Sequence, residues 1–213
     1  MVQKPKARRG RPRSYDPGRA LAQATAAFWD AGYSGTSLDK LSAATGMNRP
    51  SLYGAFGDKH ALYLKAIEGY RATARAGMQA SLPQDGPLKA AFGVLYQRAI
   101  SLYLSGENGA RGCLLVSTAA TEAVMDPEIR RAARVALEEI DAAFEARFRH
   151  ACEQGDLPRS ADPAALAKLA SAILHTLSVR ARTGAPRAVL ERIAASGVDL
   201  ICGPGKPSRR RVG

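Results

Sequence analysis

Apolar residues recur at spacings of three and four along almost the whole chain, and this periodicity constrains the fold more than any other feature. Such spacing places apolar side chains on one face of a helix, and no sustained strand-type alternation interrupts it. Asp-Pro pairs begin at Asp16, Asp126 and Asp162. Each pair marks a helix start, because aspartate caps the first turn and proline sits where a missing N–H leaves nothing unpaired. The sequence therefore predicts an all-α protein.

Breaks in the periodicity divide the chain into about nine helices. The first helix stops at Gly32, and Gly46 separates the next two. The expected helices span residues 17–31, 37–45, 48–55, 59–78, 87–104, 112–123, 127–154, 162–182 and 186–202. The tail over residues 203–213 is rich in Gly, Pro and Arg, and we expect it to be disordered.

Positive charge is concentrated at the two ends of the chain. Of the 31 Lys and Arg residues, ten lie in residues 4–13 and 206–211, where there is no acid. The other 21 almost balance the 19 acids, although the formal net charge is +12. Basic arms on a nearly neutral globule usually bind a polyanion, most commonly nucleic acid. Solubilising ends are the alternative, and that alternative fits the C-terminal arm better than the N-terminal one.

Several classes of protein are disfavoured. No run of about 18 apolar residues could span a membrane, and no apolar stretch follows the basic N-terminus, so we expect a cytoplasmic protein. Cys113, Cys152 and Cys202 are odd in number and widely spaced, which argues against disulfides and a Cys-pair zinc site. Neither a nucleophile–base arrangement nor ligand-like histidine spacing occurs. We therefore expect no enzyme activity, no metal and no cofactor.

Residues 38–59, LDKLSAATGMNRPSLYGAFGDK, have the pattern of two short helices joined by a turn at Gly46. Glycine permits a backbone conformation there that a side chain would resist. The positions expected to form a shared small core are Leu38, Leu41, Met47, Leu52 and Phe56. The start of the second helix is left exposed, and in helix-turn-helix motifs that end enters the major groove of DNA.

The run from Phe28 to Leu62 resembles the N-terminal domain of the TetR/AcrR family of regulators. The shared features are aromatic-x-x-x-Gly-Tyr at residues 28–33, Thr36, the Gly46 turn, Leu52-Tyr53, Phe56, and Lys59 with Leu62 after it. Ser42 and Thr45 replace the usual alanines, and Pro50 replaces a common glycine. The resemblance covers about the first third of the chain. It implies a three-helix DNA-binding domain followed by a helical ligand-binding and dimerisation domain.

The resemblance also assigns DNA contacts to individual positions. Thr36, Tyr53 and Lys59 match phosphate contacts, and Lys59 stands at a helix start, whose N–H groups attract phosphate. Arg49 is the first candidate for base reading because arginine pairs bidentately with guanine, and Ser51 is the second. The remaining expected contacts are Asn48, as a helix cap and phosphate contact, and Pro50, against a thymine methyl group. A core position for Tyr53 and a merely solvated charge for Arg49 are the alternatives.

The N-terminal arm has a Gly-Arg-Pro centre flanked by arginines. This pattern resembles an AT-hook, which lies in a narrow minor groove where negative potential is concentrated. The arm directly precedes the first helix, and arms in that position reach the groove beside the major-groove site. The arginines expected to contact DNA are Arg8, Arg9, Arg11 and Arg13.

By the same resemblance, the middle helices form a cavity for a small-molecule effector. Aromatic side chains with polar tips suit an apolar or aromatic ligand that needs one or two hydrogen bonds. The predicted pocket residues are Tyr70, Phe92, Tyr96, Ile100, Tyr103, Cys113, Phe144 and Phe148. A position in the core is the alternative for each of them.

The last two expected helices share a broad apolar face. We expect them to form a four-helix bundle between the subunits of a homodimer, because this face would otherwise be a large exposed patch. The predicted interface residues are Leu166, Leu169, Ile173, Leu177, Val189 and Ile193. Packing within the core of a single chain is the alternative.

Cys113 suggests a second mode of regulation. It follows Arg111-Gly112 and opens an expected helix, and a nearby cation and a helix N-terminus both lower the pKa of a thiol. The hypothesis is a redox or electrophile sensor. The ordinary alternative is a small, buried cysteine.

The expected domains are a basic arm (1–14), a helix-turn-helix domain (15–65), a ligand-binding and dimerisation domain (66–202) and a basic tail (203–213). We expect a ligand-released repressor that binds a palindromic operator in double-stranded DNA as a homodimer. Activation is an alternative, because the sequence says nothing about the position of the operator in a promoter. Regulation through Cys113, and a ligand-independent DNA-architectural protein that uses its basic tails, are the alternative functions.

Overall fold

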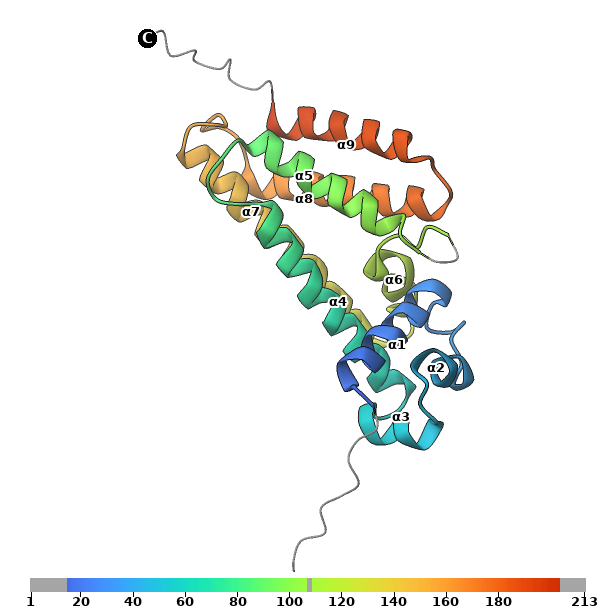
Figure 1. Cartoon of the computed structure of the whole chain (residues 1–213). Coiled ribbons are helices and arrows are strands. Elements are labelled where there is room, and N and C mark those ends of the chain that lie inside the picture. Colours follow the sequence, from blue (N-terminus) through green and yellow to red (C-terminus); the bar gives the residue numbers. More distant parts are fainter. Residues whose placement is uncertain (1–14, 107–108, 204–213) are drawn as a thin grey trace, which may run out of the picture.

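The structure is a computed structural model that describes residues 15–106 and 109–203. Every regular element in these ranges is helical, so the all-α prediction is confirmed (Figure 1). The first half contains α1 (Pro17–Ala31), α2 (Leu38–Thr45), α3 (Arg49–Phe56), α4 (Lys59–Ser81) and α5 (Leu88–Tyr103). The second half contains the π-helix η1 (Leu115–Ala119), α6 (Ala120–Glu122), α7 (Pro127–Glu153), α8 (Pro163–Arg182) and α9 (Arg187–Cys202).

Local signals set the helix starts. The carboxylates of Asp16, Asp126 and Asp162 each accept hydrogen bonds from two backbone amides in the first turn of α1, α7 and α8. Proline follows each aspartate, as the sequence pattern predicted. Between α2 and α3, Gly46 has a φ of 66°, a left-handed conformation that favours glycine. The turn of the helix-turn-helix motif is therefore built where the sequence indicated.

The helices form a head at one end of the molecule and a body at the other (Figure 1). The head consists of α1, α2 and α3, and the body of α4 to α9. Helix α4 runs from the head into the body alongside α7, and α5, α8 and α9 pack together at the far end. Because α4 is continuous from residue 59 to residue 81, it crosses the predicted boundary between residues 65 and 66. Helix α4 therefore connects the head to the body without a break.

The helix expected over residues 112–123 begins later than predicted. Gly112 has a φ of 65°, which is incompatible with an α-helix. The helical segment therefore starts after it, with η1 and α6. A Cβ atom on Gly112 would lie 2.9 Å from the backbone oxygen of Ser178, so close packing also requires glycine. The Gly112 carbonyl accepts a hydrogen bond of 3.0 Å from Trp29 Nε1. Gly112 is thus a contact point between α1 and α8.

The described residues also bear on the membrane proteins and metal-binding proteins that the sequence disfavours. No helix in residues 15–106 and 109–203 has the length and apolar character needed to cross a membrane. Within the same ranges, no group of three or more His, Cys, Asp or Glu side chains is arranged to hold a metal ion. The predicted DNA contacts Arg8, Arg9, Arg11 and Arg13, and the tail from residue 204 onward, lie outside the described residues.

Candidate functional site

The start of α3 forms an exposed polar surface on the head. Asn48 caps the helix, and its side-chain oxygen accepts a hydrogen bond of 2.9 Å from the Ser51 amide. Tyr53 is 46% exposed, so the alternative of a core position for this ring is wrong. The residues that the sequence assigned to this end, Asn48, Arg49, Pro50, Ser51 and Tyr53, are all exposed. They are therefore available to a major groove.

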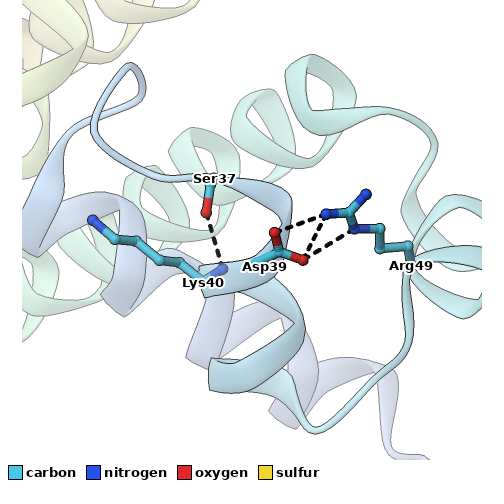
Figure 2. Close-up of polar contacts among 4 residues, drawn as sticks. All are labelled: Ser37, Asp39, Lys40 and Arg49. Carbon is cyan, nitrogen blue, oxygen red and sulfur yellow. Dashed lines mark hydrogen bonds and ion pairs between the residues drawn. The ribbon is translucent and has the colours of Figure 1, made fainter.

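Arg49 is paired with a carboxylate from the neighbouring helix (Figure 2). Its Nη2 lies 2.6 Å and 2.7 Å from Oδ1 and Oδ2 of Asp39, and its Nε lies 3.1 Å from Oδ1. Both side chains are more than half exposed. The hydrogen bonds and charge of Asp39 raise the pKa of Arg49. Sequence reasoning missed Asp39, although it is the only acid in residues 31–57.

Thr36 does not occupy the surface position that its predicted phosphate contact requires. The residue is fully buried, and its hydroxyl donates a hydrogen bond of 2.6 Å to the Gly32 carbonyl. A second, longer bond of 3.3 Å reaches the Ala27 carbonyl. The hydroxyl thus ties the end of α1 to the loop before α2. The buried hydroxyl of Thr36 is therefore not available to a phosphate group, and its role is structural.

Replacing Thr36 with valine tests that role. Loss of the buried hydroxyl should lower the free energy of unfolding by about 1 kcal/mol. The salt dependence of DNA binding should stay unchanged, because no phosphate contact is lost. Lys59→Met is the comparison, and its slope of log affinity against log salt should fall by about one. A flattened slope in Thr36→Val, measured by fluorescence anisotropy, would place the threonine on the DNA after all.

Lys59 begins α4 beside the head. Its ammonium lies 4.2 Å from the centre of the Tyr33 ring, a cation–π contact. Partial burial lowers the pKa of Lys59 and raises the pKa of Tyr33. The aromatic ring holds the ammonium at the first turn of α4, where Asp58 caps the Ala61 amide and the other backbone N–H groups have no partner within the helix. This arrangement suits the phosphate contact that the resemblance assigned.

A pocket of about 610 Å³ lies between the head and the body. Helix α1 contributes one wall, and α4 and α5 contribute most of the others. Of the predicted pocket residues, Tyr70, Tyr103 and Cys113 line it. Sequence reasoning missed the small residues of α4, Gly69, Thr73, Ala74 and Gly77, and the α1 residues Leu21, Thr25 and Trp29. The small side chains on one face of α4 were the available signal.

Five predicted pocket residues belong instead to the core. Phe92 stacks on Phe148 at a centroid distance of 4.7 Å and meets the edge of Phe144 at 5.3 Å. Tyr96 is also fully buried and donates a hydrogen bond of 3.0 Å to the Ala170 carbonyl. The residues outside the pocket are Phe92, Tyr96, Ile100, Phe144 and Phe148. They pack between α5, α7 and α8, because large apolar side chains there fill each other's space.

The expected activation of the Cys113 thiol is wrong. Burial raises the pKa of Cys113, and this effect exceeds the lowering by the Tyr70 hydroxyl and by the amides of Val116 and Leu115. The Arg111 guanidinium stacks on the Trp29 ring, with its carbon 4.1 Å from the ring centre. Tyr70 donates a hydrogen bond of 3.2 Å to the sulfur. The thiol is therefore held protonated at neutral pH.

The head and the body are joined by side-chain hydrogen bonds next to the pocket. Arg182, at the end of α8, donates hydrogen bonds to the carbonyls of Trp29, Asp30 and Arg111 at 2.9–3.3 Å. The indole N–H of Trp29 donates a hydrogen bond to the Gly112 carbonyl. Ser34 donates a hydrogen bond of 3.0 Å to Glu122. The end of α1 is thus fixed to the body on the same side as the pocket wall.

The predicted interface residues on α8 and α9 divide into two groups. Leu177 is fully buried in the core of its own chain, so its assignment to a subunit interface is wrong. Leu169 is 55% exposed, and the others are half-buried: Leu166, Ile173, Val189 and Ile193. Two apolar residues that the prediction omitted, Val179 and Leu200, are exposed on the same helices.

Comparisons with known proteins agree with this architecture. The family model described as "Bacterial regulatory proteins, tetR family" matches residues 20–66. A second model, "Tetracyclin repressor-like, C-terminal domain", matches residues 95–196. The two matches fall on the head with the start of α4, and on the body.

Relatives of known type extend the match to nearly the whole chain. The repressor ComR of Escherichia coli is 29% identical over 206 residues, which are 90% of this chain and 91% of ComR. The uncharacterised regulator YezE of Bacillus subtilis is 30% identical over 148 residues, which are 70% of this chain and 76% of YezE.

A solved structure of a cysteine-substituted form of the regulator CifR, in complex with 26-bp double-strand operator DNA, superimposes with a TM-score of 0.81. It is 30% identical, and the match covers 88% of this chain and 98% of that one. The head, the body and the exposed α3 surface thus coincide with a known regulator architecture. The chain belongs to the TetR family of helix-turn-helix, DNA-binding transcriptional regulators, and it is not an enzyme.

Proposed function

We propose that this chain is a ligand-released repressor that binds a palindromic operator as a homodimer. The observation that carries the proposal is the pocket of about 610 Å³ between head and body. Because its walls come from both α1 and α4, one bound molecule would contact the head and the body together. The names of ComR and BdcR of Escherichia coli as repressors support repression over activation.

The pocket gives a route for release. A ligand that fits better when α1 and α4 are further apart favours that arrangement in proportion to its difference in affinity. Trp29 lines the pocket and is also bonded to Gly112, so separation of these walls strains a contact between head and body. Movement of α1 or α4 changes where α3 stands relative to the second subunit. The two recognition helices then no longer match successive major grooves.

The lining indicates the chemistry of the effector. Most of the wall is apolar, which suits an apolar or aromatic molecule. Tyr70, Arg98, Tyr103 and His175 add a few polar groups. Burial lowers the pKa of His175, and its Nε2 has no hydrogen-bond partner within the described residues. A neutral imidazole in this position can hydrogen-bond one polar group of the ligand.

The exposed face of α8 and α9 supports a homodimer. Leu169, Val179 and Leu200 are large apolar side chains that are about half or more exposed on this face. A copy of the same face would cover them in a four-helix bundle. The face lies at the opposite end from the head, so both heads of such a dimer remain free for DNA (Figure 1). We place this activity in the cytoplasm, where the chromosome of a bacterium is accessible.

An aromatic probe tests ligand release. We expect 1-anilinonaphthalene-8-sulfonate to enter the pocket and fluoresce, and to weaken binding to a selected operator duplex by about 5- to 150-fold. Gly77→Leu fills the pocket, because Gly77 lines it and a Cβ there meets no atom within 4 Å. This variant should lose most probe binding and all of the probe's effect on DNA.

Gly93→Leu is the matched control. Gly93 is also a helical glycine with open space around a Cβ, but it does not line the pocket. The control should therefore bind the probe like the unmodified protein. If the probe saturates the pocket and operator affinity does not change, the pocket is not coupled to DNA binding and ligand release is wrong.

A further inference from the structure

The Asp39–Arg49 pair connects the beginnings of two neighbouring helices, α2 and α3. Asp39 lies in the first turn of α2, and Arg49 is the first residue of α3. Ser37 already caps α2 through the Lys40 amide, so Asp39 is free to bind Arg49 (Figure 2). The Lys40 side chain extends away from the pair and donates a hydrogen bond to the Gly35 carbonyl. Within the described residues, the Asp39 carboxylate therefore accepts side-chain hydrogen bonds from Arg49 and from no other residue.

The geometry of the pair leaves Nη1 of the guanidinium open. Asp39 contacts Nε and Nη2, which form the side edge of the group, and Nη2 donates to both carboxylate oxygens. Nη1 makes no hydrogen bond within the described part of the chain, so its N–H groups are available to a base. A bidentate contact to guanine O6 and N7 through Nη1 and Nη2 requires Nη2 to release one carboxylate oxygen, while Nε keeps its bond to Asp39. The ion pair and a base contact can thus exist together.

We propose that Asp39 is a positioning residue that sets the base specificity of α3 by orienting the guanidinium of Arg49. The inference rests on the proposed base reading by Arg49. An arginine side chain has several rotatable bonds, and fixing it before binding removes the cost of ordering it on the DNA. Asp39 also cancels the charge of Arg49, so the pair attracts phosphate weakly and retains its directional hydrogen bonds. The result is greater preference for the correct base with little gain in nonspecific affinity.

The strength of the pair excludes a different role, in which Asp39 locks Arg49 away from DNA. More than half of each side chain is exposed, and exposed ion pairs shift an equilibrium by only about fivefold or less. A lock of that strength could not keep the protein off its operator. An ion pair of this strength is enough to favour one orientation of the Arg49 side chain.

Selection from a library of random-sequence DNA duplexes tests the proposal. The proteins compared are the unmodified chain, Asp39→Asn, Arg49→Ala and the double variant. We expect the unmodified chain to select a guanine at one position of each half-site. In Asp39→Asn that preference should fall by about 2- to 5-fold, while binding to random duplex strengthens and its salt slope becomes steeper by about one. In the Arg49→Ala background, Asp39→Asn should change the preference no further.

Two controls separate positioning from general charge. Asp30→Asn removes another acid of the head that makes no contact with Arg49, and it should leave the base preference intact. Thermal unfolding shows whether each variant folds, and the exposure of Asp39 predicts that Asp39→Asn does. An unchanged base preference in Asp39→Asn overturns the proposal, as does an equal change at every base position. A failure of the unmodified chain to select any sequence counts instead against base reading itself.

Discussion

Replacing Arg49 with alanine should reduce the preference for the operator over random DNA by about 5- to 150-fold for each half-site, the typical value of one bidentate base contact. In the proposed homodimer the effects at the two half-sites multiply, which gives about 25-fold to about 20,000-fold. The reason is geometric, because Arg49 is the longest side chain at the exposed start of α3 and Asp39 leaves its Nη1 open. Affinity for random duplex should change much less.

Fluorescence anisotropy with a selected duplex and a scrambled duplex, across a salt series, measures this ratio. Lys59→Met is the control, since it removes the positive charge at the start of α4 but leaves the Asp39–Arg49 pair in place. That variant should weaken binding to both duplexes alike and flatten the salt dependence. The two variants thus distinguish base reading from attraction to phosphate.

The opposite result would favour a different kind of DNA-binding protein. If Arg49→Ala keeps the full preference, α3 does not read bases through this residue. If deletion of residues 1–13 then removes all binding, the basic arm supplies the affinity. The architectural alternative, in which the arms bind DNA without ligand control, would become the better account.

Local features of the chain were predictable because short-range chemistry determines them. The Asp-Pro pairs place helix starts at residues 17, 127 and 163, since the cap and its amides lie within three residues of each other. Gly46 likewise determines its own turn. The exposed polar start of α3 followed from the same reasoning. Nothing distant along the chain was needed to infer these elements.

Long-range packing explains what sequence reasoning missed. Helical periodicity shows that α5 and α7 each have an apolar face, but it cannot show which part of that face meets another side chain and which meets a void. Phe92 and Phe144 are 52 positions apart and fill each other's space, so they leave no pocket. The void forms instead beside Gly77 and the other small residues of α4. Burial of Cys113 depends in the same way on a distant segment, since Tyr70 of α4 packs against its sulfur.

Phe92→Ala should lower the free energy of unfolding by about 3–5 kcal/mol, a large part of the stability of a typical domain. The ring is fully buried and lies against both Phe148 and Phe144, so its removal leaves a cavity among rigid neighbours. Chemical denaturation monitored by circular dichroism measures this loss. Phe92→Leu keeps more of the volume and should lose less, which provides a folded variant if the alanine form does not fold.

The same variants decide whether the phenylalanine cluster belongs to the pocket. Because Phe92 does not line the pocket, folded Phe92→Leu should bind 1-anilinonaphthalene-8-sulfonate with unchanged affinity. Leu102→Ala is the converse, since Leu102 lines the pocket and is 39% exposed. It should alter probe affinity at a stability cost of about 1 kcal/mol or less. If Phe92→Leu alters probe affinity as strongly as Leu102→Ala does, the ligand reaches the aromatic cluster. The effector site would then extend between α5 and α7, as the sequence first indicated.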